Sequence, residues 1–377
     1  MQPVATVVSF RLGGTDGVSV EAAKWMAALA ALGFAVRRVA GEIAGAALPG
    51  DRLVPGLSIT PSVPAGHDEV AAAIEGSDLV VVENLLSLPL NRSAAAVVAG
   101  VLADHPRVVL HHHDLAWQRR EYVDVAPWPL PLPTAIHVVI NDRSRRELGE
   151  RGIDATTIPN HFDLDPPAGD RHGTRARLGV AADDVLVLHP VRAIPRKNVP
   201  GALALCEELR ARLPARRTWY WLPGPAEDGY AAELDALLAA SAERGAVDVL
   251  RAAPPSMPDA YAAADLVVFP STWEGFGNPV IESVVARRPL AVGNYPVLSE
   301  VTDLGFEFLP ADGPDEVAAV VSGMRELTPV FDANLALARR HFSLDLLPSR
   351  LAALLEGAGW EVPSARPAHQ SATAEVR

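Results

Sequence analysis

Short runs of apolar residues recur along the whole chain and alternate with stretches of helical periodicity such as residues 18–32. The runs are residues 4–10, 34–40, 78–84, 107–113, 135–140, 184–190, 218–224, 247–252, 266–271, 289–293 and 306–310. Strands of a parallel sheet are buried on both faces, so they appear as continuous apolar runs instead of alternating patterns. Their regular alternation with helices is typical of βαβ units. The sequence therefore predicts an α/β fold built on parallel sheets.

A break in this rhythm at residues 163–174 is rich in Pro, Gly and Asp and predicts a linker. A chain of 377 residues also exceeds the usual size of one domain. We expect two Rossmann-like, doubly wound domains, residues 1–170 and 171–342, that face a central cleft. A C-terminal helix at about 343–360 is expected to pack back on the first domain, and the polar tail 361–377 is expected to be disordered.

Composition narrows the class of partner and the compartment. The net charge of −13 argues against nucleic acid and against an anionic membrane surface. No apolar run approaches the roughly 20 residues of a membrane span, and the N-terminus lacks the basic segment of a signal peptide. The single cysteine, Cys206, is expected to be a buried thiol. These features favour a soluble, cytoplasmic protein. Richness in Arg and Ala, with only two lysines, is typical of a GC-rich bacterial genome.

The segment STWEGFGNPVIES, residues 271–283, follows an apolar run and places Glu274 and Glu282 on either side of a glycine-containing turn. Asn278 before Pro279 is a sensible start for a helix, with Asn278 as its N-cap. Free N–H groups at a helix start favour an anion, and carboxylates accept hydrogen bonds from hydroxyls. A nucleotide sugar carries both kinds of group. The spacing of the two glutamates alone is also compatible with an ordinary strand-to-helix loop that carries a solvated glutamate.

The whole segment 259–300 resembles the E-x7-E region of the retaining GT-B glycosyltransferases of family GT4, the glycosyl transferases group 1. The flanks DAYAAADLVVFPS and RRPLAVGNYPVLSEV carry the resemblance together with the two glutamates. It extends over about residues 179–302 and is looser in the N-terminal half. It implies a GT-B fold, in which Glu282 would hold the ribose hydroxyls and Glu274 would lie near the donor sugar.

The same resemblance implies roles for the turn between the glutamates. Backbone N–H groups of Phe276, Gly277 and Asn278 would contact the sugar or the diphosphate. Many relatives carry Leu or a small residue at the position of Asn278, so the resemblance does not name the sugar.

The segment HPVRAIPRKNVPGAL resembles the R-x4-K element of this family, with Arg192 and Lys197 at the matching spacing. A departing nucleoside diphosphate develops negative charge, which fixed cations stabilise. Arg196 is interpreted as a surface residue. Because two cations would serve the diphosphate, and no DxD-type cluster has a supporting context, we expect neither a metal ion nor a cofactor.

A glycine-rich loop follows the first apolar run. Gly13, Gly14 and Gly17 do not have the G-x-G-x-x-G spacing of dinucleotide-binding proteins. The resemblance implies that Gly13 and Gly14 let the backbone approach the diphosphate, with Asp16 as a possible acceptor contact. A plain tight turn is the alternative.

Three histidines end the run at residues 107–113. Adjacent residues of a strand point to alternate sides, so the three cannot all bind one metal ion. The resemblance implies that His113 faces the reacting sugar, with His111 as the second choice. A structural histidine is the alternative for each.

Polar residues at neighbouring strand ends are candidates for contact with the acceptor. Glu83 and Asn84 end one apolar run, and Arg119 lies on the loop after the histidines. Ordinary loop polarity is the alternative for these residues.

The sequence therefore predicts a retaining, metal-independent glycosyltransferase. It would move a hexosyl unit from a UDP- or GDP-linked sugar to a hydroxyl of a soluble small molecule or saccharide. The N-terminal half shows no basic amphipathic helix of the kind that binds membranes, which favours a soluble acceptor. The alternatives are a nucleotide-sugar epimerase or hydrolase on the same fold, and a non-catalytic nucleotide-sugar binder. Glycine spacing disfavours a nicotinamide enzyme, and neither Lys24 nor Lys197 has the context of a pyridoxal lysine in a phosphorylase.

Overall fold

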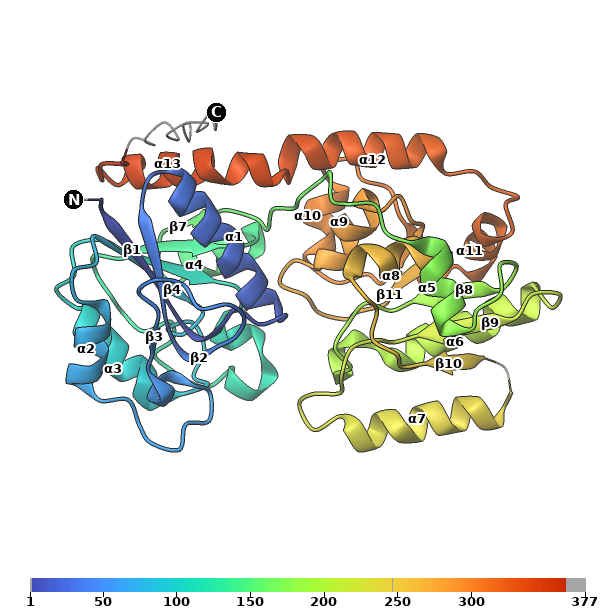
Figure 1. Cartoon of the computed structure of the whole chain (residues 1–377), viewed down its shortest axis with the longest axis horizontal. Helices are drawn as coiled ribbons and strands as arrows, with labels where there is room; N and C mark the ends of the chain where they lie inside the picture. Colours follow the sequence, from blue (N-terminus) through green and yellow to red (C-terminus); the bar gives the residue numbers. More distant parts are fainter. Residues whose placement is uncertain (1, 246, 364–377) are drawn as a thin grey trace, which may run out of the picture. The chain divides into compact units, whose positions relative to one another are not determined.

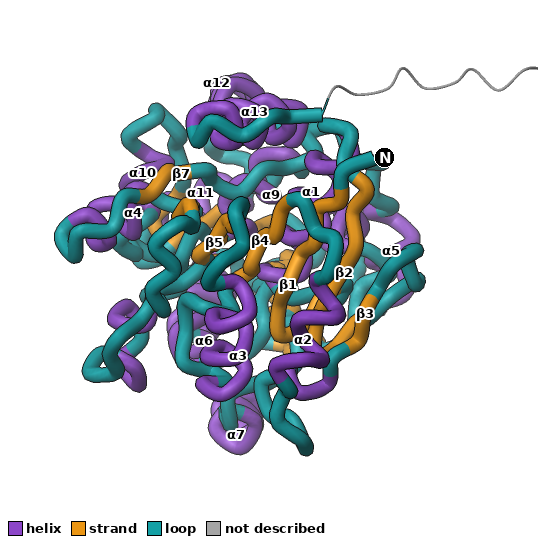
Figure 2. Tube along the Cα trace, turned by 90° about the vertical axis from the view of Figure 1, so that its left-hand side faces the viewer, coloured by secondary structure: helices purple, strands orange, loops and turns teal. Residues whose placement is uncertain are grey.

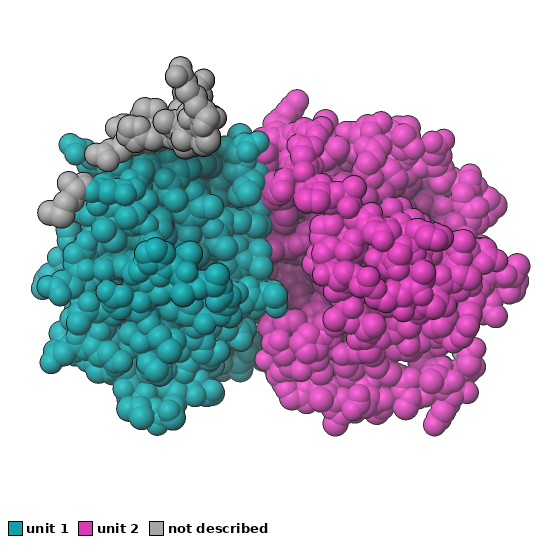
Figure 3. All heavy atoms as spheres, viewed as in Figure 1, with its two compact units in different colours: residues 1–161, 344–377 teal, residues 162–343 magenta. Residues whose placement is uncertain are grey.

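The computed structural model describes residues 2–245 and 247–363 and divides the chain into two compact units. Unit 1 comprises residues 1–161 and 344–377, and unit 2 comprises residues 162–343 (Figure 3). The sequence placed these boundaries at 170 and 342, whereas the structure divides the chain at 161 and 343. Most of the tail that was expected to be disordered, residues 364–377, lies outside the described residues.

Unit 1 is built on a seven-stranded parallel sheet with the strand order β3-β2-β1-β4-β5-β6-β7. Figure 2 shows β5, β4, β1, β2 and β3 side by side. The strands are β1 (Val4–Leu12), β2 (Ala35–Ile43), β3 (Arg52–Leu53), β4 (Leu79–Glu83), β5 (Val108–His112), β6 (Ile136–Val139) and β7 (Ala155–Thr157). The α-helices are α1 (Gly17–Ala31), α2 (His67–Ile74), α3 (Arg92–Leu102), α4 (Asp142–Gly149) and α13 (Leu347–Gly357). Short 3-10 helices are η1 (Pro55–Leu57), η2 (Ala116–Gln118), η3 (Arg120–Tyr122) and η5 (Leu344–Leu346).

The sheet of unit 1 carries a hydrophobic core on each face, which explains its continuous apolar strands. One core joins the strands to α1 and α13 through Trp25, Leu29 and Leu351. The other joins them to α2 and α3 through Val70 and Val98. The α13 helix therefore packs beside α1 although the two are far apart in the sequence (Figure 1).

Unit 2 is built on a six-stranded parallel sheet with the strand order β10-β9-β8-β11-β12-β13. Its strands are β8 (Val185–Leu188), β9 (Thr218–Trp221), β10 (Asp248–Leu250), β11 (Leu266–Phe269), β12 (Leu290–Val292) and β13 (Leu309–Pro310). Its helices are α5 (Arg171–Leu178), η4 (Pro195–Lys197), α6 (Val199–Arg212), α7 (Ala231–Glu243), α8 (Met257–Ala263), α9 (Asn278–Val285), α10 (Leu298–Thr302), α11 (Pro314–Val321) and α12 (Thr328–His341). The prediction of two doubly wound parallel sheets is confirmed.

Several elements differ from the sequence-based expectation. Strands β3 and β7 were not predicted, because they are short and β7 has the sequence ATT instead of an apolar run. Helix α5 begins inside the expected linker 163–174, where the Asp170 side chain accepts from the Gly173 N–H as an N-cap.

The start of α9 also requires a correction. Its N-cap is Gly277 rather than Asn278, and Asn278 is the first helical residue. Gly277 has a φ of +91°, and a Cβ there would lie 2.3 Å from Tyr295 Oη. Glycine is therefore needed at this turn for both its backbone angle and the lack of a side chain.

Each sheet reverses its winding at one point, between β1 and β4 in unit 1 and between β8 and β11 in unit 2. Ligands of doubly wound sheets bind beyond the carboxyl ends of the strands at this switch point. The residues singled out in the sequence follow these strands or their neighbours.

Candidate functional site

In unit 2, the loops after β8 and β11 meet at a buried glutamate. Glu274 is 5% exposed, and each of its carboxylate oxygens has its own cation. Lys197 Nζ lies 2.5 Å from Oε1, and Arg196 Nη1 lies 2.7 Å from Oε2. Arg196 Nη1 also donates to the Trp273 carbonyl at 2.7 Å. Two cations from one loop therefore fix the carboxylate on the other.

Burial and charge set the protonation of this cluster in opposite directions. Burial lowers the pKa of Lys197 to about 8, although Glu274 acts to raise it. Burial acts to raise the pKa of Glu274, but the charges of Lys197 and Arg196 outweigh it and lower that pKa. At neutral pH the site therefore holds an ammonium group and a carboxylate.

Arg192 leaves the same loop but pairs elsewhere. Its Nη1 lies 2.5 Å from Oε2 of Glu227, which lies on the loop after β9. Both side chains are about one third exposed. An anion that binds Arg192 must therefore share this guanidinium with Glu227 or displace it.

Glu282 lies in α9 and accepts a hydrogen bond from the phenol of Tyr261 in α8, with 2.6 Å between Oη and Oε2. Tyr261 is 3% exposed, and burial, reinforced by Glu282, raises its pKa well above the ordinary value. The phenol thus stays a neutral donor that fixes one oxygen of Glu282. The sequence analysis did not assign Tyr261 a role, although it lies in the segment DAYAAAD that carried the resemblance.

Phe276, Gly277 and Asn278 lie at the start of α9, where the prediction concerns their backbone N–H groups. The Phe276 side chain packs against the rings of Phe162 and Phe342, with centroids 5.9 and 5.5 Å away. Tyr295 Oη donates to the Phe276 carbonyl at 3.0 Å. Packing and this hydrogen bond therefore hold the turn in one conformation.

Arg196, interpreted as a surface residue, keeps 33% of its side chain exposed, but its guanidinium bonds to Glu274, a contact that the sequence analysis did not predict. Sequence reasoning also missed Glu227, the partner of Arg192. Lys197 and Arg196 are neighbours in η4, so a tight turn directs both toward Glu274. The position of Arg196 beside Lys197 was the available signal, while nothing in the local sequence marked Glu227.

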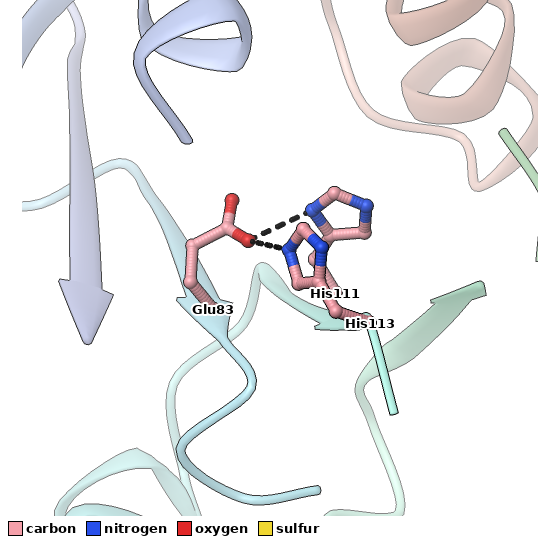
Figure 4. A group of neighbouring side chains, drawn as sticks. All are labelled: Glu83, His111 and His113. Atoms are coloured by element: carbon pink, nitrogen blue, oxygen red, sulfur yellow. Dashed lines mark hydrogen bonds and ion pairs between the residues drawn. The ribbon is translucent and has the colours of Figure 1, made fainter. Parts of the chain in front are cut away.

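In unit 1, a second cluster forms where β4 and β5 end (Figure 4). Glu83 pairs with His111 in the parallel register of these strands, and its side chain is fully buried. Its Oε2 accepts from both His111 Nδ1 at 2.9 Å and His113 Nε2 at 2.7 Å. The two rings therefore share one carboxylate oxygen.

The middle histidine points to the opposite side of the sheet, as strand geometry predicted. His112 Nδ1 lies 2.6 Å from Ser87 Oγ, and His112 Nε2 lies 2.9 Å from His137 Nδ1. Among the described residues, Glu83, His111 and His113 form a buried group whose ligand-type atoms lie within 4.8 Å of one another. That spacing could admit a metal ion, but both imidazole contacts have hydrogen-bond lengths.

The acceptor-side candidates other than Glu83 have structural partners of their own. Asn84 Oδ1 accepts from the backbone N–H groups of His113 and Asp114, at 3.0 and 3.3 Å. Arg119 pairs with Asp114 at 2.7 Å and keeps 31% of its side chain exposed. The acceptor roles of Asn84 and Arg119 stay predictions.

The glycine-rich loop after β1 is also held by local contacts. Gly13 has a φ of +77°, and a Cβ there would lie 2.1 Å from the Ala44 carbonyl oxygen, so the turn itself requires glycine. Asp16 is the N-cap of α1, and its carboxylate binds the Ser19 N–H and Arg11. At Gly14 a Cβ would lie 3.3 Å from Asp16 Oδ2. The ligand-binding roles of these three positions stay predictions.

Comparison with known proteins agrees with this geometry. Residues 186–326 match the profile of the family described as Glycosyl transferases group 1. Over these residues the chain is similar to the group 1 glycosyl transferases. The matched segment contains Arg192, Lys197, Glu274 and Glu282.

Two curated relatives align with most of the chain. The mannosylglucosylglycerate synthase of Petrotoga mobilis is 25% identical over 80% of this chain and 85% of its own length. The D-inositol 3-phosphate glycosyltransferase of Streptomyces scabiei is 27% identical over 66% of this chain and 63% of its own.

A solved structure supports the fold of this chain. HepE of Anabaena, solved with UDP-glucose, superposes with a TM-score of 0.71 at 18% identity, over 94% of this chain and 99% of that chain. The expected GT-B class is thereby confirmed. No helix within residues 2–245 and 247–363 combines the length and the apolar character that a membrane crossing requires.

Proposed function

We propose that this glycosyltransferase retains the anomeric configuration of its donor. It would move a hexosyl unit from a UDP- or GDP-linked sugar to a hydroxyl of a soluble small molecule or saccharide. The observation that carries the proposal is the cluster at the switch point of the unit 2 sheet. There Lys197 and Arg196 clamp Glu274, and Arg192 leaves the same loop.

The cations serve the leaving group. As the bond between the sugar C1 and the phosphate oxygen breaks, its electron pair leaves with the nucleoside diphosphate. Lys197 and Arg192 supply fixed positive charge where this negative charge develops, so they stabilise the transition state more than the bound donor. Because these two cations serve the diphosphate, we propose that transfer needs no metal ion.

The two glutamates serve the hydroxyl groups of the donor. Glu282 keeps one oxygen on Tyr261 and uses the carboxylate to accept from the ribose hydroxyls. Glu274 lies at the strand end beside Lys197, where a carboxylate can accept from the sugar hydroxyls. The N–H groups at the start of α9, eight residues long, face the same ligand with the positive end of the helix dipole.

Retention follows if the acceptor hydroxyl attacks C1 from the face that the diphosphate leaves. The new bond then forms between the acceptor oxygen and C1, and the hydroxyl proton passes to the departing phosphate oxygen. That oxygen is the nearest base in such a front-face transfer, and no side-chain nucleophile is required. His113 binds a sugar hydroxyl in this scheme.

The names of the similar proteins support the substrate class. HepE was solved with UDP-glucose. The names of the two curated relatives denote a glycosylated glycerate and an inositol phosphate acceptor, which are small and polar. A soluble polyhydroxy acceptor is in keeping with the acidic balance of this chain.

The test is a transfer assay with α-linked UDP- and GDP-hexoses and a panel of small polyols, sugar acids and saccharides, in EDTA. We expect release of UDP or GDP that depends on an acceptor, with an α-linked product by NMR coupling constants. A β-linked product would overturn retention, and dependence on added metal would overturn metal independence. Donor hydrolysis, epimerisation or binding without an acceptor-linked product would favour the alternative functions.

A further inference from the structure

We propose that Glu83 is a positioning residue, whose buried carboxylate orients His113 so that its second ring nitrogen, Nδ1, faces the substrate as an N–H donor. This inference rests on the proposed function, in which His113 faces the reacting sugar. It replaces a direct contact of Glu83 with the acceptor, and it assigns Glu83 an effect on the reaction through His113.

The geometry fixes both the ring and the backbone of His113. Its Nε2–H is committed to Glu83 at 2.7 Å, while its backbone N–H donates to Asn84 at 3.0 Å. The side chain is 6% exposed, and its Nδ1 has no hydrogen-bond partner among the described residues. With Nε2–H held by Glu83, a proton on Nδ1 makes the ring an imidazolium, which the carboxylate stabilises.

Glu83 itself cannot reach a ligand without a rearrangement of the site. Its side chain is 0% exposed, and the two rings share its Oε2 on one side (Figure 4). His111 is a fixed support, because its ring stacks on Trp25 with centroids 4.0 Å apart and lies 4.4 Å from the His113 ring. Of the three, His113 is the most exposed, at 6% against 1% for His111 and 0% for Glu83.

The charges around His113 act in the same direction. Glu21 on α1 is 2% exposed and pairs with Lys24 at 2.5 Å, and Asp114 pairs with Arg119. Burial would lower the pKa of His113, but its bond to Glu83 and the charges of Glu83, Glu21 and Asp114 raise that pKa above the ordinary value.

The partners of His113 in the cluster respond in a consistent way. Burial acts to raise the pKa of Glu83, yet His111 and His113 outweigh it and lower that pKa to about 2. Burial lowers the pKa of His111. The cluster thus holds its carboxylate ionised and places the extra proton on His113.

The protonation of His113 sets the direction in which the rate of transfer changes with pH. The donor form of His113 is present below its raised pKa and is lost as pH rises through that value. Without the carboxylate, the pKa of His113 loses the two largest contributions that raise it, so the same loss occurs at lower pH. A purely structural Glu83 would change stability but not the position of this alkaline limb.

The experiment compares the full-length wild type with Glu83→Gln and with Ser87→Ala as a matched control. Ser87→Ala removes a buried hydrogen bond to an imidazole of the same strand, on the opposite face of the sheet. His113 is followed by NMR of its ring, assigned with His113→Asn, and the rate of transfer is measured from pH 5.5 to 9.

For Glu83→Gln we expect the His113 titration and the alkaline limb of kcat to move down by about one pH unit or more. At pH 7.5 kcat should fall about tenfold and recover toward pH 6, with little change in the KM for the donor. Ser87→Ala should keep the wild-type profile. An unchanged titration in Glu83→Gln would overturn the proposal.

Two further measurements keep the proposal testable in every case. If Glu83→Gln does not fold, the wild-type His113 must still titrate above its ordinary pKa, and a lower value would overturn the proposal. One equivalent of zinc in the purified protein, lost in Glu83→Gln, would also overturn it in favour of a metal site. Because the NMR titration needs no turnover, absence of transfer would count against the proposed function alone.

Discussion

Each unit has a buried glutamate at or after the end of a strand, and two nitrogen-bearing side chains hold it. The two clusters are nevertheless built differently. Glu274 divides its oxygens between Lys197 and Arg196, whereas Glu83 accepts from His111 and His113 on one oxygen. The partners in unit 2 are charged at neutral pH. Those in unit 1 are imidazoles, whose charge changes near neutral pH.

This difference suggests a division of labour within the reaction. A leaving diphosphate needs positive charge, which the Lys197 ammonium provides below its pKa of about 8 and Arg provides at any ordinary pH. A sugar hydroxyl needs one oriented hydrogen-bond donor, which a fixed imidazole provides. Substitution of these side chains one at a time tests this division of labour.

Lys197→Ala should give the largest effect. Loss of its ammonium removes stabilisation of the leaving diphosphate, so kcat should fall about 10²–10³-fold, which corresponds to about 3–4 kcal/mol. The KM for the donor should change much less. The measurement is kcat at saturating donor, with Arg212→Ala as control, because Arg212 is a cation on nearby α6 that pairs with Glu208 and Asp315. A loss below threefold would remove Lys197 from the catalytic cluster.

Glu282→Ala should act on binding instead of turnover. The ribose hydroxyls would lose their acceptor, so the KM for the donor should rise about tenfold or more, while kcat changes less. Glu316→Ala, at an exposed pair with Arg325, is the control. Unchanged KM in Glu282→Ala would show that the ribose lies elsewhere.

The pH profile should separate the two clusters. The pKa of Lys197 is lowered to about 8, so its ammonium is present below that pH and is lost above it. We expect kcat/KM to fall about tenfold for each pH unit above this value. Lys197→Arg should lose this limb, because guanidinium does not titrate there. It should keep the fall in rate that begins at lower pH, as pH rises through the pKa of His113. If Lys197→Arg loses both the Lys197 limb and the His113 limb, the two clusters do not titrate separately and the proposed difference between them is wrong.

Arg196→Ala should have the smallest effect. Arg196 is one third exposed, and Lys197 continues to hold the other oxygen of Glu274. A partly exposed ion pair contributes about 1 kcal/mol or less, so kcat should fall roughly fivefold or less. A loss as large as that of Lys197→Ala would make Arg196 an equal partner at the diphosphate.

These clusters also show what a sequence can predict. The apolar runs gave the strands, because burial on both faces leaves a pattern in the chain itself. Arg192 with Lys197, and Glu274 with Glu282, have fixed spacings within single loops and were visible for that reason. The structure places Glu274 beside Lys197, so one residue from each of these two patterns lies in the same cluster.

Contacts between distant segments could not be predicted in the same way. Glu83 was visible as a polar strand end, but its bonds to His111 and His113 depend on the register of β4 against β5. Glu227 meets Arg192 only because β9 lies beside β8. The Gly277 cap was missed because Asn before Pro is also a good helix start, and the close approach of Tyr295 decided between them.

The most direct test of the central claim is the affinity of the chain for UDP and GDP, measured by isothermal titration calorimetry in EDTA. The account predicts that one nucleotide binds the wild type and binds Glu282→Ala about tenfold or more weakly, with Glu316→Ala unchanged. Binding of neither nucleotide, or equal affinity in wild type and Glu282→Ala, would contradict the claim that unit 2 holds a nucleotide sugar at these residues.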